Sequence, residues 1–205
     1  GGMSTTTLIN ALLASGGPVV VGNGGRSIML DSAECIIKRL PAGGTPMALP
    51  VAIGDLLDNC GGSADKVLNK LNLIRKDGRY TNVLIGQVVA LTLNLRLYDI
   101  GCEPDIGDLG DWTLPAEFCT MGENGCPRKH KIPASLVGLT VAELLDIAND
   151  ALAGDGGPLG NINDAVTAIN EAFDECAEVV DCPTKEICDN GCDDDFDGLI
   201  DEGCI

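Results

Sequence analysis

Basic residues are scarce in this chain, and their scarcity argues against two classes of protein. Only 13 lysines and arginines stand against 31 aspartates and glutamates in 205 residues, which gives a net charge of −18. This charge argues against a nucleic-acid partner, whose phosphates require a basic surface, and against electrostatic attachment to anionic lipid. A run of about 18 apolar residues is also lacking, so we expect no membrane insertion.

Histidine and aromatic residues are nearly as rare, which limits the possible enzymes. His130 is the only histidine, so a Ser-His-Asp triad would depend on this one residue. The G-x-S-x-G, P-loop and dinucleotide-binding motifs are absent. A glycosidase with two carboxylates needs no histidine and stays open as a lesser alternative. Aromatics are only 3% of the chain, however, and sugar sites favour aromatic platforms. We therefore expect a protein that is not an enzyme and has no catalytic residues.

Cysteine, in contrast, is abundant. An even, high count in a small acidic chain indicates an oxidising compartment and a framework of disulfides. Zinc thiolates are the weaker alternative, because the sequence has no C-x-x-C pair and a single histidine. The pairing stays open from sequence alone. The predicted disulfide residues are Cys35, Cys60, Cys102, Cys119, Cys126, Cys176, Cys182, Cys188, Cys192 and Cys204.

The first residues, Gly1-Gly2-Met3, show no export signal. We therefore expect a processed product, an excised fragment of a longer chain, or a chain that starts with residues left over from cloning. Together with the cysteines, this favours a secreted protein whose signal has been removed, located outside the cell or on the cell surface.

The fold class that the patterns predict is α+β, with three regions. Residues 1–58 are glycine-rich and apolar, and "PVVVG" and "RSIML" read as short strands around a glycine turn at residues 23–25. The stretch "ECIIKRLP" (residues 34–41) reads as a third strand. These strands form an ordinary small sheet or, alternatively, an exchange arm that pairs with a neighbouring molecule.

Residues 59–180 are predicted to form a mainly helical core. Helices are expected over 63–76, with Ser63 as the N-cap, and over 81–95, with Thr81 as the cap. The alternation of leucines at 91, 93, 95 and 97 would suit a strand instead. A capping box at Thr140, a stop at Gly154 and a glycine-proline loop at 155–160 predict two helices packed as an antiparallel hairpin.

Residues 101–133 read as a loop region held by disulfides. Within it, "CPRKHK" (residues 126–131) is interpreted as a solvated loop tip. The alternative is a contact for an anion or a sugar, and Trp112 belongs to the same loop region.

Residues 181–205 form an acidic, cysteine-rich tail with too few apolar residues to fold by burial alone. Within it, alternate aspartates followed by a glycine have the spacing of a calcium loop, in which oxygen ligands converge at about 2.3–2.6 Å from the ion. Cys204 stands where an EF-hand has its bidentate glutamate, so Glu202, Asp189 or water would complete the shell. The predicted calcium ligands are Asp193, Asp195, Asp197, the carbonyl of Leu199, Asp201 and Glu202.

The sequence "CDNGCDDDFDGLID" resembles the D-x-D-x-D-G-x-x-D calcium loops of thrombospondin type 3 repeats and a metal-binding motif of secreted bacterial surface proteins. This resemblance covers about 17 residues and implies a Ca²⁺ ion that makes a module with little core rigid. Residues 80–176 resemble a recurring unit of large secreted proteins of Bacteroidetes-type bacteria, for which no activity is established.

The function that these features predict is a secreted structural protein, stabilised by disulfides and Ca²⁺, that self-associates into a filament or matrix. Apolar strands near the N-terminus would join copies head to tail. The alternative is a surface adhesin or carbohydrate-binding module that binds cell-surface glycans through residues 101–133.

Overall fold

The computed structural model describes residues 3–100, 108–122, 125–173, 179–187 and 189–200. Within these ranges lie six α-helices and two three-stranded sheets, so the α+β prediction is confirmed. The helices are α1 (Thr5–Gly16), α2 (Ala33–Arg39), α3 (Gly62–Lys70), α4 (Val83–Ile100), α5 (Val141–Ala153) and α6 (Leu159–Ala172). The strands are β1 (Val19–Asn23), β2 (Arg26–Leu30), β3 (Asp55–Leu57), β4 (Glu117–Met121), β5 (Pro127–Lys131) and β6 (Val179–Val180).

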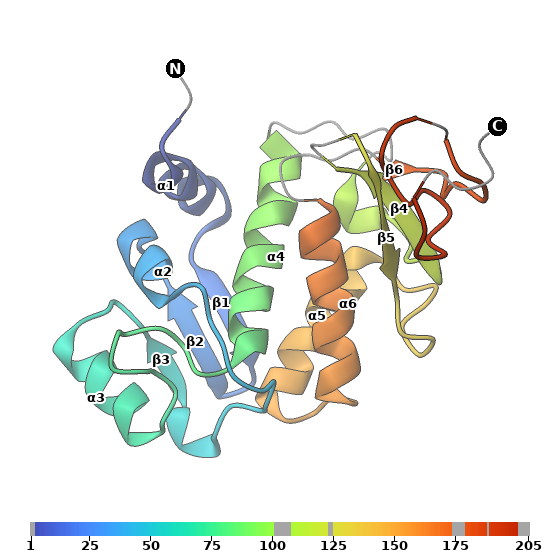
Figure 1. Ribbon diagram of the computed structural model, residues 1–205. Helices are drawn as coiled ribbons and strands as arrows, with labels where there is room; N and C mark the ends of the chain where they lie inside the picture. Colours follow the sequence, from blue (N-terminus) through green and yellow to red (C-terminus); the bar gives the residue numbers. More distant parts are fainter. Residues whose placement is uncertain (1–2, 101–107, 123–124, 174–178, 188, 201–205) are drawn as a thin grey trace.

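The two sheets lie on opposite sides of three packed helices, α4, α5 and α6 (Figure 1). β1 contacts α4 and α5, whereas β5 contacts α6. One cluster of buried apolar side chains runs from α1 to the end of α6 and includes residues of both predicted regions, 1–58 and 59–180. The acidic tail lies beyond the second sheet, far from α3 (Figure 1).

The first sheet has the order β1-β2-β3. β1 and β2 pair antiparallel, with Val19 opposite Leu30, and β3 runs parallel to β2. The predicted strands and the turn between them are thus present. Val19 and Leu30 are completely buried, so both strands contribute to the molecule's own core. Exchange of this region with a neighbouring molecule stays a prediction about assemblies.

The prediction of a third strand at "ECIIKRLP" was wrong, because residues 33–39 form α2. The hydroxyl of Ser32 caps this helix by accepting a hydrogen bond from the Cys35 amide at 3.3 Å. Glu34 lies in the first turn and Lys38 in the last, where each charge complements the helix dipole. The adjacent isoleucines favoured a strand in the sequence, but capping and charge placement favour the helix.

The helix α1 was not predicted. Ser4 caps it by accepting a hydrogen bond from the Thr7 amide at 3.2 Å, and Ile9 and Leu12, three residues apart, are buried beneath it. Gly16 is the last residue of this helix, and Gly17 follows it as the C-cap.

The helix predicted over 63–76 is the shorter α3, with Gly61 as its N-cap in place of Ser63. The helix predicted over 81–95 is confirmed as α4, but Asn82 rather than Thr81 caps it, since its side-chain oxygen accepts from the Leu84 amide at 3.2 Å. Five other elements pack around α4. A helix buried on most sides is apolar on most sides, which explains why its leucines also suited a strand.

The predicted helix hairpin is confirmed by α5 and α6, which pack against each other. Thr140 and Glu143 form the capping box at the start of α5, and Gly154 ends it with a left-handed backbone at φ 95°. The hairpin brings Leu144 and Ile169 into the core, completely buried.

The second sheet has the order β5-β4-β6, and its pairs are antiparallel. The interpretation of residues 126–131 as a solvated loop tip was wrong, because residues 127–131 form β5. His130 is buried, stacks on Phe118 and shares a 2.9 Å hydrogen bond with the Thr120 hydroxyl. Along the strand Pro127 and His130 are buried, whereas Arg128 and Lys131 are exposed and Lys129 is half-buried.

A pH dependence of stability follows from this position of His130. Burial lowers the pKa of His130 below its ordinary value of 6.5, and the charge of Arg128 lowers it further. As the pH falls below about 6.5, the unfolded chain therefore takes up a proton before the folded chain does, and the free energy of unfolding decreases until the folded pKa is reached.

We expect His130→Gln to flatten this decrease in urea titrations between about pH 7 and pH 5. Arg128→Gln serves as a matched variant, because removal of its charge makes the decrease shallower without removing the imidazole. An unchanged pH dependence in His130→Gln would contradict this account.

Candidate metal centre

Three carboxylates of the tail converge on one point. Oxygen atoms of Glu186, Asp193 and Asp195 all lie within 4.8 Å of one another. Two ligands on opposite sides of a calcium ion are separated by at most about 5.2 Å, twice the longest Ca–O distance. The spacing of these carboxylates therefore suits a shared dication.

Backbone hydrogen bonds to Asp193 shape the loop. Its Oδ1 accepts from the Asp197 amide at 3.1 Å, and its Oδ2 accepts from the Gly198 amide at 3.0 Å. The turn requires a left-handed backbone at Phe196 and Gly198, with φ of 64° and 96°. The glycine that the calcium-loop pattern requires at the sharp turn thus occupies such a turn here.

Glu186 was missed by the sequence reasoning, because the aspartate pattern begins seven residues later. Its Oε1 accepts hydrogen bonds from the amides of Asp194 and Asp195 at 3.0 and 3.3 Å. These bonds hold the chain folded back on itself between Glu186 and Asp195. The buried Asp194 stabilises the same turn, since its Oδ2 accepts hydrogen bonds from the Ile187 amide and the Asn190 side chain at 3.0 and 2.8 Å. Only these contacts, between residues four to nine positions apart, reveal the third carboxylate.

The electrostatics of this group favour a cation. Burial, followed by the negative charges of Asp197, Glu186 and Asp193, raises the pKa of Asp195. The Oδ1 atoms of Asp194 and Asp195 are buried and have no hydrogen-bond partner. A buried carboxylate oxygen without a partner is costly, and a hard dication is a suitable partner for it.

The remaining predicted ligands differ in their placement. Asp197 does not belong to the three-residue group, and its Oδ1 accepts a hydrogen bond from the Leu199 amide at 2.9 Å. Leu199 is exposed. Asp201 and Glu202 lie outside the described residues. Coordination by these four residues stays a prediction.

Disulfides tie the tail to the second sheet, and the disulfide prediction is confirmed for the described cysteines. Cys119 of β4 bonds Cys182, and Cys126, just before β5, bonds Cys192. The third pair, Cys35–Cys60, lies on the other side of the molecule. The four cysteines at 102, 176, 188 and 204 lie outside the described residues.

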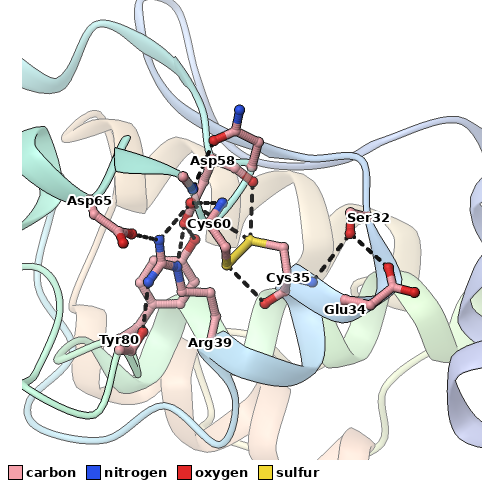
Figure 2. The surroundings of a disulfide bond; sticks show 11 residues. Ser32, Glu34, Cys35, Arg39, Asp58, Cys60, Asp65 and Tyr80 are labelled. Carbon is pink, nitrogen blue, oxygen red and sulfur yellow. Dashed lines mark hydrogen bonds and ion pairs between the residues drawn. A yellow bond between two sulfur atoms is a disulfide. The ribbon is translucent and has the colours of Figure 1, made fainter. Parts of the chain in front are cut away.

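A second cluster of charged groups surrounds the Cys35–Cys60 disulfide (Figure 2). The guanidinium of Arg39 donates to both carboxylate oxygens of Asp58, at 2.6 and 2.7 Å, and both side chains are fully buried. Arg39 also donates to Asp65 at 2.5 Å and to the Gly78 carbonyl at 2.8 Å. Tyr80 donates its hydroxyl to Asp58 at 2.6 Å. Each of these contacts is a direct hydrogen bond.

The hydrogen bonds around Arg39 and Asp58 keep both of these side chains charged. Burial works to raise the pKa of Asp58, but hydrogen bonds from Arg39, Tyr80 and the Cys60 amide outweigh it and lower this pKa below its ordinary value. Burial likewise opposes the charge of Arg39, but its hydrogen bonds to Asp58 and Asp65 raise the pKa. Burial and the charge of Asp58 raise the pKa of Tyr80, which therefore stays a hydrogen-bond donor.

This second cluster is structural rather than metal-binding. Cys35, Asp58 and Cys60 also offer closely spaced ligand atoms, but the two sulfurs are bonded to each other. The carboxylate of Asp58 is already shared by Arg39 and Tyr80. The tail group is thus the better candidate for a metal ion.

Trp112, considered for a sugar contact, packs edge-on against Phe118 and Phe173 with ring centroids at 4.9 and 5.3 Å. Its ring thus contributes to a small aromatic cluster between the second sheet and α6.

Comparison with known proteins gives no relative: no family model, no curated protein and no solved structure matches the chain. Within the described ranges, none of the helices combines the length and the apolar character needed to cross a membrane.

Proposed function

We propose that this protein is an extracellular structural protein, stabilised by disulfides and by Ca²⁺, that assembles with copies of itself. The observation that carries the proposal is the convergence of Glu186, Asp193 and Asp195 beside a buried oxygen of Asp195 that has no partner. Glu186, Asp193 and Asp195 would hold the ion. The bound ion would supply charge compensation and rigidity, and no chemical reaction.

The disulfides support an extracellular location, because such bonds persist in oxidising compartments. A tail with two buried residues in its described part, Cys192 and Asp194, needs stabilisation other than a hydrophobic core. Disulfides and calcium provide it without any cellular energy source, which suits a molecule that persists outside the cell.

Calcium binding is tested by titration calorimetry, combined with thermal unfolding in excess calcium and in excess chelator. Because an ion that binds only the folded state adds stability by mass action, we expect calcium at 100 times Kd to raise the Tm by about 5–10 °C. Glu186→Gln and Asp193→Asn should each weaken binding at least tenfold.

Asp181→Asn is the matched control, since it removes the same charge from an exposed position of the tail outside the three-residue group. If the control loses as much affinity as Glu186→Gln, the net charge of the tail rather than a defined site binds the ion. If the parent protein gives no heat of binding with calcium, the calcium part of the proposal is wrong.

A further inference from the structure

The charges of this protein are divided unequally along the chain. Residues 1–100 hold nine basic and seven acidic side chains, whereas residues 101–205 hold four basic and 24 acidic ones. The net charge is therefore about +2 in the first part and about −20 in the second. An acidic protein thus keeps most of its cations in one part of its fold.

Six exposed cations lie on the segments that the buried Arg39 joins. This residue joins three segments, because it belongs to α2, pairs with Asp65 of α3 (Figure 2) and donates to the Gly78 carbonyl in the turn after α3. The cations stand on these same segments, which we call the basic lobe. They are Lys38, Lys66, Lys70, Arg75, Lys76 and Arg79.

The basic lobe is poorly neutralised by the molecule itself. Among the described residues, its exposed cations form a single ion pair, Arg79 with Asp77, at a loose 3.9 Å. Of the other acidic groups on or beside these segments, Asp58 and Asp65 are paired with Arg39, and Glu34 accepts a hydrogen bond from the Ser32 hydroxyl. The lobe therefore presents an excess of positive charge to solvent and suits an acidic partner.

The helix hairpin formed by α5 and α6 carries charge of the opposite sign. No basic residue occurs anywhere between positions 132 and 184. Exposed acids lie on both α5 and α6, which pack against each other, and we call this set of residues the acidic face. Its residues are Glu143, Asp146 and Asp150 on α5, and Asp164 and Glu171 on α6. None of them forms an ion pair within the described part of the chain.

We propose that the basic lobe of one copy docks on the acidic face of the next copy. This inference rests on the self-assembly proposed above and names the surfaces that carry it. The occupant is a second copy because each chain supplies both complementary surfaces in equal number. The carboxylates of the tail are the poorer partner, since they accept hydrogen bonds from their own backbone.

The geometry of this contact determines the form of the assembly. Two different surfaces meet, so the contact is heterologous and extends into an open chain unless the rotation closes a ring. The overall charge of −18 opposes association only weakly at physiological salt, where charges more than about 8 Å apart are screened. The local attraction of opposite charges therefore dominates at the contact.

Charge reversal combined with sedimentation tests the proposal. One variant carries Lys66→Glu, Lys70→Glu and Lys76→Glu in the basic lobe; the other carries Asp146→Lys, Asp164→Lys and Glu171→Lys on the acidic face. We expect the parent protein to assemble at about 150 mM salt, where the overall charge is screened, and to dissociate at about 1 M salt, where the contact itself is screened. Each variant alone should stay monomeric, and an equimolar mixture of the two should assemble again.

A third variant, with Arg128→Glu, Lys131→Glu and Lys185→Glu, changes the net charge as much as the lobe variant does but leaves both surfaces intact. It should assemble at a protein concentration within a few-fold of the parent's, whereas the lobe variant should need at least ten times more. Assembly of the lobe variant at the parent's concentration overturns the inference and leaves self-assembly standing.

A parent protein that stays monomeric at every salt concentration overturns self-assembly together with this contact. A monomer that is retained on a heparin column, and loses this retention in the lobe variant, assigns the basic lobe to another polyanion and also overturns the inference. Calcium binding is measured separately by calorimetry, so its outcome does not depend on these results.

Discussion

Replacement of Arg39 by methionine is expected to lower the free energy of unfolding by about 3–5 kcal/mol, because the buried carboxylate of Asp58 loses its counter-charge. Arg39 and Asp58 are both fully buried, and two hydrogen bonds join them directly. Methionine fills a similar volume but donates no hydrogen bond, so Asp58 retains only Tyr80 and the Cys60 amide as donors. The loss is large relative to the total stability of about 5–15 kcal/mol that is usual for folded proteins.

The matched control is Arg79→Met, the same chemical change in an exposed ion pair with Asp77 at 3.9 Å. An exposed pair of this kind contributes about 0–1 kcal/mol. Urea unfolding followed by far-ultraviolet circular dichroism measures both variants. Equal losses of unfolding free energy in the two variants would show that the buried Arg39–Asp58 pair stabilises the fold no more than an exposed pair does.

Removal of the Cys126–Cys192 disulfide by serine substitution of both residues is the second change with a large expected effect. This bond closes a loop with a sequence separation of 66 residues, and loss of a native disulfide from a small secreted domain costs about 2–5 kcal/mol. The tail near it has few buried side chains to hold it in place. We expect residues 183–199 to become the first site of proteolytic cleavage and the calcium affinity to fall, since Glu186 and Asp193 would no longer be held together.

Serine substitution of both Cys35 and Cys60 is the control for this experiment. It removes a disulfide from the opposite side of the molecule and should lower the stability there while leaving the tail resistant to protease. Equal protease sensitivity of the tail in the two double variants would contradict the assigned role of the Cys126–Cys192 bond.

The parts of the fold that the sequence predicted are those with local signals. The capping box at Thr140 and the glycine at 154 fix the limits of α5 within one stretch of chain. The turn at residues 23–25 similarly determines the register of β1 and β2. Each of these signals acts between residues that are neighbours in the sequence.

Two of the parts that were missed depend on partners outside the local pattern. The strand predicted at residues 34–41 is a different case, because the Ser32 cap and the charges of Glu34 and Lys38 are local signals for α2 that the adjacent isoleucines outweighed. His130 was placed in a loop tip because its partner Thr120 lies on the opposite strand. Glu186 joins the candidate metal centre only because the chain folds back at residues 187–190. A pattern of aspartates predicted the kind of site but not all of its members.

The position of Trp112 has a practical consequence for all of these measurements. It is the only tryptophan, and its ring lies against Phe118 and Phe173, next to the sheet that carries the tail. Its intrinsic fluorescence therefore provides a built-in optical reporter for that side of the molecule. Opening of the region around Arg39 should leave this emission unchanged, so the two halves of the protein can be followed independently without an added dye.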